Sequence, residues 1–120
     1  MKLQDVMKDF LDQTPGLDLV AYGDLSSGLI LNSASKVACP RERLDLLGEK
    51  AAICFGLAPK GAGVVGNSWA LHFSERETQV FARQPETSDE VICAVCQPGT
   101  ALQPLLIAAI DLAGRMAGPE

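Results

Sequence analysis

The sequence predicts one α+β domain spanning residues 1–120. Apolar residues recur with helical spacing in three separate segments, near the start, in the middle and at the end of the chain. Five short strand-like segments lie between them, and tight turns join two neighbouring pairs as antiparallel hairpins. The predicted order is therefore helix, strand, strand, helix, strand, strand, strand, helix.

The first predicted helix is amphipathic, with apolar residues at i, i+3, i+4, i+7 and i+8 from Leu3 to Leu11. Thr14-Pro15-Gly16 ends it, because proline cannot continue a helix and glycine permits a turn. Two strands follow over residues 17–24 and 29–33. The turn between them is short, so we expect a hairpin.

The second predicted helix runs from Pro40 to Leu57, because proline is tolerated at a first helical position. The glycine-rich segment Gly61–Gly66 is then expected to be a flexible link. Apolar and polar residues alternate over 69–74, which predicts a strand, and residues 78–83 form the second arm of its hairpin.

The continuous apolar run Val91–Cys96 predicts a central buried strand. Thr100 and Gln103 have the spacing of a capping box, and a helix is expected to follow to about Ala117. That helix is apolar almost all round, which indicates either deep burial or a docking surface.

Composition and charge exclude several classes of partner. The chain of 120 residues carries 10 basic and 15 acidic side chains, a net charge of −5 without a basic run, which disfavours nucleic acid and anionic membranes. No apolar run is long enough to span a bilayer, and the start does not resemble a signal peptide. Four cysteines without such a signal predict free thiols and a cytoplasmic location.

The segment Gly61–Ser68 matches the dinucleotide pattern G-x-G-x-x-G and nearly matches a phosphate-binding loop. Both sites need a strand before the loop and a helix after it, and here a predicted helix precedes and a predicted strand follows. Asn67 also stands where the phosphate loop has its lysine. A connector is the preferred interpretation, with a nucleotide- or ligand-binding sensor as the alternative function.

No catalytic, metal or cofactor site is predicted. Cys93 and Cys96 form a CxxC pattern, but residues three apart on a strand point to opposite faces, so both are expected to be buried structural thiols. His72 is the only histidine, and it alternates with the apolar Trp69, Leu71 and Phe73, so we expect a solvated side chain on the other face. The protein is therefore not expected to be an enzyme.

The second helix carries two apolar faces. A core face is shared by Leu44, Leu47, Ala51, Phe55 and Ala58, whereas Leu46, Ile53 and Leu57 lie on roughly the opposite side. A row of small residues at i, i+4 and i+8 favours close approach of another backbone: Gly48, Ala52 and Gly56. Scattered exposed leucines are normal on monomers, but contiguous apolar surface favours a subunit interface.

The chain resembles the roadblock/dynein light-chain family, which includes bacterial regulators of Ras-like GTPases. The resemblance rests on the first helix ending in Pro15-Gly16, on the hairpin with an acidic turn, and on the strand Val91–Cys96 followed by an apolar helix. It implies a profilin-like, five-stranded antiparallel sheet with two helices on one face and one on the other.

The resemblance also implies a homodimer, in which the second helix packs on its twin and the third strand pairs edge to edge. The interface residues we predict are Leu46, Gly48, Ala52, Ile53, Gly56, Leu57, Trp69, Leu71 and Phe73. Family members lack an active site of their own. The implied function is a non-catalytic adaptor that binds a small Ras-like GTPase, which it scaffolds or whose nucleotide state it modulates.

Overall fold

The computed structural model of the protein describes residues 3–57, 64–65, 69–83 and 89–117. Within these ranges the chain forms three α-helices, one π-helical turn and six strands. In chain order they are α1 (Leu3–Gln13), β1 (Leu17–Asp24), β2 (Leu29–Ser35), α2 (Arg41–Ala52), η1 (Ile53–Leu57), β3 (Val64–Val65), β4 (Trp69–Phe73), β5 (Thr78–Ala82), β6 (Glu90–Cys96) and α3 (Leu102–Ala117).

All strands belong to one antiparallel sheet in the order β2-β1-β6-β5-β4-β3. The five longer strands are those the sequence predicts, and β6 lies in the middle, paired with β1 and β5. The sixth strand, β3, pairs only Val64 and Val65 with Leu71 and Ala70 of β4. It lies in the segment predicted as a flexible link, so that prediction is wrong for these two residues.

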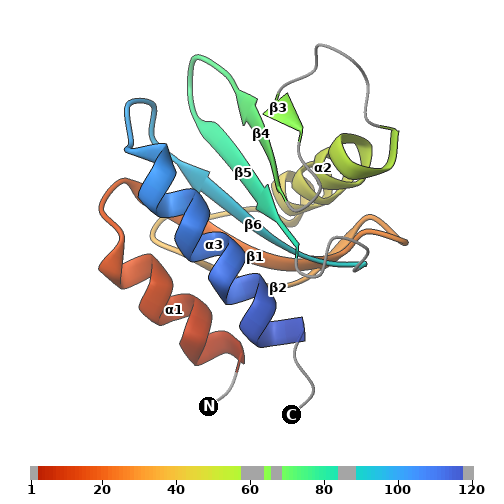
Figure 1. Ribbon diagram of the computed structural model, residues 1–120, viewed down its shortest axis with the longest axis horizontal. Coiled ribbons are helices and arrows are strands. Elements are labelled where there is room, and N and C mark those ends of the chain that lie inside the picture. The colour runs from red at the N-terminus through yellow and green to blue at the C-terminus, as the bar shows by residue number, and fades with distance from the viewer. Residues whose placement is uncertain (1–2, 58–63, 66–68, 84–88, 118–120) are drawn as a thin grey trace.

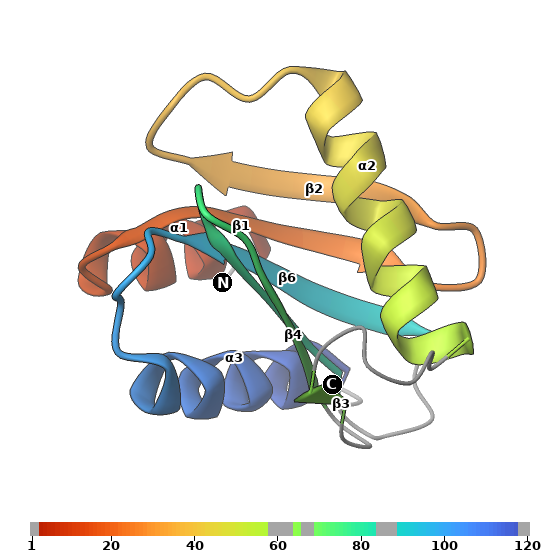
Figure 2. The same ribbon diagram turned by 90° about the horizontal axis from the view of Figure 1, so that it is seen from above.

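The helices cover the sheet on both faces, as expected. Helices α1 and α3 lie side by side on one face, and α2 lies across the other (Figures 1 and 2). The first face packs Met7, Leu11 and Leu105 onto the sheet, and the second packs Leu44 and Leu47. Because β6 is buried on both faces, its sequence is a continuous apolar run rather than an alternation.

Several boundaries differ from the predicted ones for local reasons. Pro40 is the N-cap of α2 rather than its first residue, with an extended backbone (φ −62°, ψ 153°). The predicted last turn of the same helix, Ile53–Leu57, has π-helical hydrogen bonding. The strand predicted over 29–33 also continues to Ser35, with a bulge opposite Tyr22 and Gly23 of β1.

The predicted capping box at the start of α3 does not form. The Thr100 hydroxyl donates to the backbone oxygen of Gln97 at 2.6 Å, so it stabilises the preceding turn, and the helix begins at Leu102. The apolar surface of α3 is mostly core, because Leu105 and Leu112 are buried. Ile107 is the exception and is 61% exposed.

Candidate functional site

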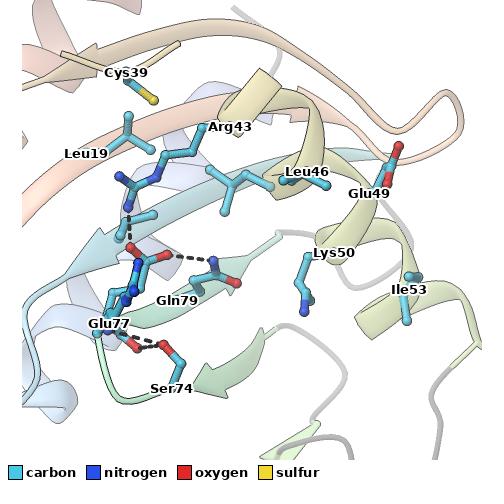
Figure 3. A pocket seen from close by; sticks show the side chains of 13 residues that line it. Leu19, Cys39, Arg43, Leu46, Glu49, Lys50, Ile53, Ser74, Glu77 and Gln79 are labelled. Carbon is cyan, nitrogen blue, oxygen red and sulfur yellow. Dashed lines mark hydrogen bonds and ion pairs between the residues drawn. The ribbon is translucent and has the colours of Figure 1, made fainter. Parts of the chain in front are cut away.

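A groove lies between α2 and the sheet surface that α2 leaves uncovered (Figure 3). It encloses about 660 Å³. We call it the α2 groove. It is lined by Leu19, Cys39, Arg43, Leu46, Leu47, Glu49, Lys50, Ile53, Ser74, Arg76, Glu77, Gln79 and Val95.

The helix side of the α2 groove is partly apolar and open to solvent. Leu46 is 65% exposed and Ile53 is 43% exposed, although both are large aliphatic side chains. By contrast, Leu44, Leu47 and Ala51 are at most 8% exposed and pack on the sheet. The two faces that the helical periodicity predicts are therefore confirmed for these residues.

The sheet side of the groove is polar. The Arg43 guanidinium on α2 forms an ion pair with Glu77, which directly precedes β5. This ion pair links the helix to the β4–β5 turn. The Gln79 amide nitrogen donates to the other Glu77 oxygen at 2.9 Å (Figure 3). Among the described residues, the buried Gln79 Oε1 finds no hydrogen-bond donor. An unpaired buried acceptor of this kind is costly.

Lys50, which lines the groove on α2, lies beside His72 on β4. Its Nζ lies 3.4 Å from His72 Nε2, a distance at which the ammonium donates to a neutral imidazole. Burial, and then the Lys50 charge, lower the pKa of His72 below its usual 6.5, and Glu77 opposes them weakly. His72 is half-buried rather than solvated as predicted, although it does lie on the face opposite Leu71.

The predicted small-residue row has a partner within the same chain. Gly48 is buried, and a Cβ built on it would lie 2.4 Å from the carbonyl oxygen of Gly28. The close backbone approach that the row predicts therefore exists, but at Gly48 it joins α2 to the β1–β2 turn. Ala52 is half-buried, while Gly56 and Leu57 lie in η1.

The predicted β4 interface residues face the α1–α3 side of the sheet. Leu71 is buried in that core, and Trp69 packs against it. Phe73 is 53% exposed. Because β3 already pairs with Ala70 and Leu71, any further edge pairing by β4 involves the end of the strand that carries Phe73.

Most of the glycine-rich segment Gly61–Ser68 falls outside the described residues. The flanking elements are nonetheless clear, because α2 and η1 precede it and strand β4 follows. A helix N-terminus, which nucleotide-binding loops use to hold phosphate, does not follow this segment.

Cys93 and Cys96 are buried in opposite cores, as their spacing predicts, and burial raises the pKa of both thiols. In the described part of the chain, His, Cys, Asp and Glu side chains do not gather in any group of three suited to a metal. No helix among the described residues is long and apolar enough to cross a membrane.

Sequence reasoning missed the polar groups of the groove. Arg43 and Glu77 are 34 residues apart, and Lys50 and His72 are 22 apart, so no local pattern joins them. One usable signal was present on α2 itself. Leu46, Glu49, Lys50 and Ile53 have spacing i, i+3, i+4 and i+7, which places them on one side of a helix.

No protein-family model matches the sequence, and no curated protein matches it either. Solved structures do match its fold. A Roadblock/LC7 domain from Streptomyces avermitilis aligns with a TM-score of 0.75 and 11% identity, over 97% of this chain and 95% of that one.

Two further structures align over nearly the whole chain. The gliding protein MglB from Thermus thermophilus gives a TM-score of 0.64 and 20% identity, over 94% of this chain and 86% of that one. LokiProfilin2, solved in complex with rabbit actin, gives 0.69 and 14%, over 97% of each chain. The chain therefore has the α+β fold of the Roadblock/LC7 domains and MglB, which is also similar to that of a profilin.

Proposed function

We propose that the protein is a non-catalytic homodimeric adaptor that binds a small Ras-like GTPase and scaffolds it or changes its nucleotide state. The observation that carries this proposal is the exposed apolar side of α2, Leu46 and Ile53, beside an open groove in a roadblock-type fold. The resemblance of the sequence to the roadblock/dynein light-chain family supplies the class of partner.

Self-association accounts for the exposed aliphatic side chains. Burying apolar surface is favourable by about 25 cal/mol per Å². Leu46 on α2 and Ile53 at the start of η1 are separated by about two helical turns, so they lie on the same side of the continuous helix. A second copy seated on α2 would cover both residues. The end of β4, at His72 and Phe73, would lie at the edge where the predicted strand pairing extends the sheet.

A GTPase regulator of this kind needs no active site of its own. It changes the nucleotide state of its partner only if it binds the two nucleotide forms with different affinity, or supplies a group to the partner's site. The mixed charges of the α2 groove, including Arg76 and Glu49, suit a polar protein surface better than a small apolar ligand.

Binding to purified Ras-like GTPases from the same organism tests the proposal. Each GTPase is loaded with GDP or with a non-hydrolysable GTP analogue, and binding is measured by titration calorimetry. We expect one GTPase to bind, with unequal affinity in its two forms. The double substitution Leu46→Asp/Ile53→Asp should weaken this binding or the dimer that supports it.

Ile107→Asp is the control, because Ile107 is an aliphatic residue about as exposed as Leu46 and lies on α3, across the sheet from α2. It should leave GTPase binding unchanged. Failure of every GTPase to bind in either nucleotide form would contradict the proposed partner. Equal weakening by the α2 and α3 substitutions would contradict the proposed surface.

A further inference from the structure

The side of α2 that faces the groove carries two charges between its two exposed aliphatic residues. Leu46, Glu49, Lys50 and Ile53 all line the groove, and their spacing of i, i+3, i+4 and i+7 places them along one side of the helix. Figure 3 shows the Lys50 side chain pointing toward the sheet and the Glu49 side chain pointing away from it. We call these four residues the α2 stripe. Its charged pair sits in the centre, and its apolar residues sit at the two ends.

The α2 stripe is complementary to the same stripe on a second copy whose helix runs in the opposite direction. Residues 46 and 53 are equally far from the midpoint between 49 and 50. In an antiparallel pair of α2 helices related by a two-fold axis at that midpoint, Leu46 meets Ile53 of the second copy and Glu49 meets Lys50 of the second copy. A parallel pair would instead place Glu49 beside Glu49 and Lys50 beside Lys50, which repel.

Within the described part of the chain, neither of the two central charges forms an ion pair. The pairs Arg41–Asp45, Arg43–Glu77 and Arg115–Asp111 use other side chains of the described residues. Glu49 is exposed, and the Lys50 ammonium lies 3.4 Å from the neutral His72 ring, which carries no balancing charge. Charge complementarity therefore points to a second copy of this chain as the occupant.

We infer that the α2 stripe sets the register and the antiparallel direction of the homodimer through reciprocal Glu49–Lys50 ion pairs flanked by Leu46–Ile53 contacts. The inference rests on the proposed homodimer and adds the residues that orient it. Paired charges of this kind set orientation and exclude wrong arrangements more than they add raw affinity.

Charge exchange tests the register directly. Dimer dissociation constants are measured by analytical ultracentrifugation for the wild type, Glu49→Lys, Lys50→Glu and the double exchange Glu49→Lys/Lys50→Glu. Each single reversal places like charges opposite each other and should raise the dissociation constant by about tenfold or more at low salt. The double exchange restores both pairs and should return it to near the wild-type value.

Lys8→Glu is the control, because it reverses an exposed charge on α1, on the face of the sheet opposite α2. It should leave the dissociation constant close to that of the wild type. Circular dichroism melts confirm that each variant is folded, and the double exchange gives a second, independent test of the pairing.

The outcomes separate the register from the dimer itself. A wild-type dimer that neither single reversal weakens, or that the double exchange does not restore, overturns the register while leaving the homodimer intact. A monomeric wild type overturns both. If the wild type is a monomer and either charge reversal abolishes its binding to a GTPase, the α2 stripe contacts the GTPase rather than a second copy. That result would likewise overturn the inference.

Discussion

Gly48 on α2 lies directly against the backbone of Gly28 in the β1–β2 turn. A Cβ on Gly48 would approach the Gly28 carbonyl oxygen to 2.4 Å and its carbonyl carbon to 3.1 Å. Both neighbours are backbone atoms, so they cannot move aside as the end of a flexible side chain can. Gly28 itself has φ +72°, a conformation that glycine adopts readily. This contact sets how closely α2 approaches the hairpin.

Substituting Gly48→Ala should destabilise the fold. Alanine normally favours a helix over glycine by about 1 kcal/mol, but overpacking against a rigid backbone costs about 1–3 kcal/mol. We therefore expect the free energy of unfolding to fall, as measured by urea denaturation. Glu42→Ala, at an exposed position of the same helix, should change it little. A rise in stability on Gly48→Ala would show that the turn moves freely.

Strand β2 forms one edge of the sheet. Side chains from two helices bind backbone oxygens of this strand and so hinder the pairing of another strand with it. Arg41 Nη2 donates to the Ile30 carbonyl oxygen at 3.0 Å, and Gln4 Nε2 donates to the Ser33 carbonyl oxygen at 2.8 Å. Free edge groups are templates for another chain, so these donors protect the edge.

The double substitution Arg41→Ala/Gln4→Ala should open that edge. We expect species heavier than those of the wild type to appear as concentration rises, measured by light scattering behind a sizing column. Lys8→Ala, an exposed change on α1, controls for a general loss of surface charge. An unchanged mass distribution in the double variant would mean that these two bonds do not guard the edge.

His72 should make stability depend on pH in the weakly acidic range. Its folded pKa lies below 6.5, so the unfolded chain takes up the proton first as pH falls. Stability is therefore complete above about pH 6.5 and declines as pH falls toward the folded pKa. An NMR titration is unambiguous because the chain has one histidine.

His72→Gln should remove this part of the pH dependence when urea unfolding is compared on the two sides of pH 6.5. The groups that face the imidazole are Lys50 from α2 and Glu77 from the β4–β5 turn. A measured pKa at or above 6.5 would mean that the Glu77 charge outweighs burial and Lys50.

The glycine-rich segment should bind no nucleotide. A ligand present at one hundred times its dissociation constant stabilises a protein by about 2.7 kcal/mol, which is readily detected as a rise in melting temperature. We expect ATP, GTP and NAD to leave the melting temperature unchanged. A clear rise with any of them would favour the alternative function as a ligand sensor.

Local periodicity was sufficient to predict the two faces of α2. Helix geometry depends on neighbours three and four residues apart, so the burial of Leu44 and Leu47 and the exposure of Leu46 could be deduced from spacing alone. The same reasoning identified Gly48 as a site of close approach. It could not identify Gly28 as the partner, because that contact depends on how the hairpin folds beneath the helix.

Features that join distant segments, or that are very short, escaped prediction. The Lys50–His72 contact depends on the crossing of α2 over the sheet, which no local pattern encodes. Strand β3 contains two residues between glycines, too few to show the alternation that identifies a strand. Thr100 and Gln103 have the correct spacing for a capping box, but the Thr100 hydroxyl donates its hydrogen bond to the backbone oxygen of Gln97 instead.

The molar mass of the wild-type protein in solution tests the central claim most directly. Light scattering behind a sizing column at micromolar concentration should give twice the chain mass of 12.7 kDa. Leu46→Asp/Ile53→Asp should reduce the mass to that of one chain, and Ile107→Asp should not. A wild type of 12.7 kDa at every concentration would contradict the homodimer and leave the exposed side of α2 to another partner.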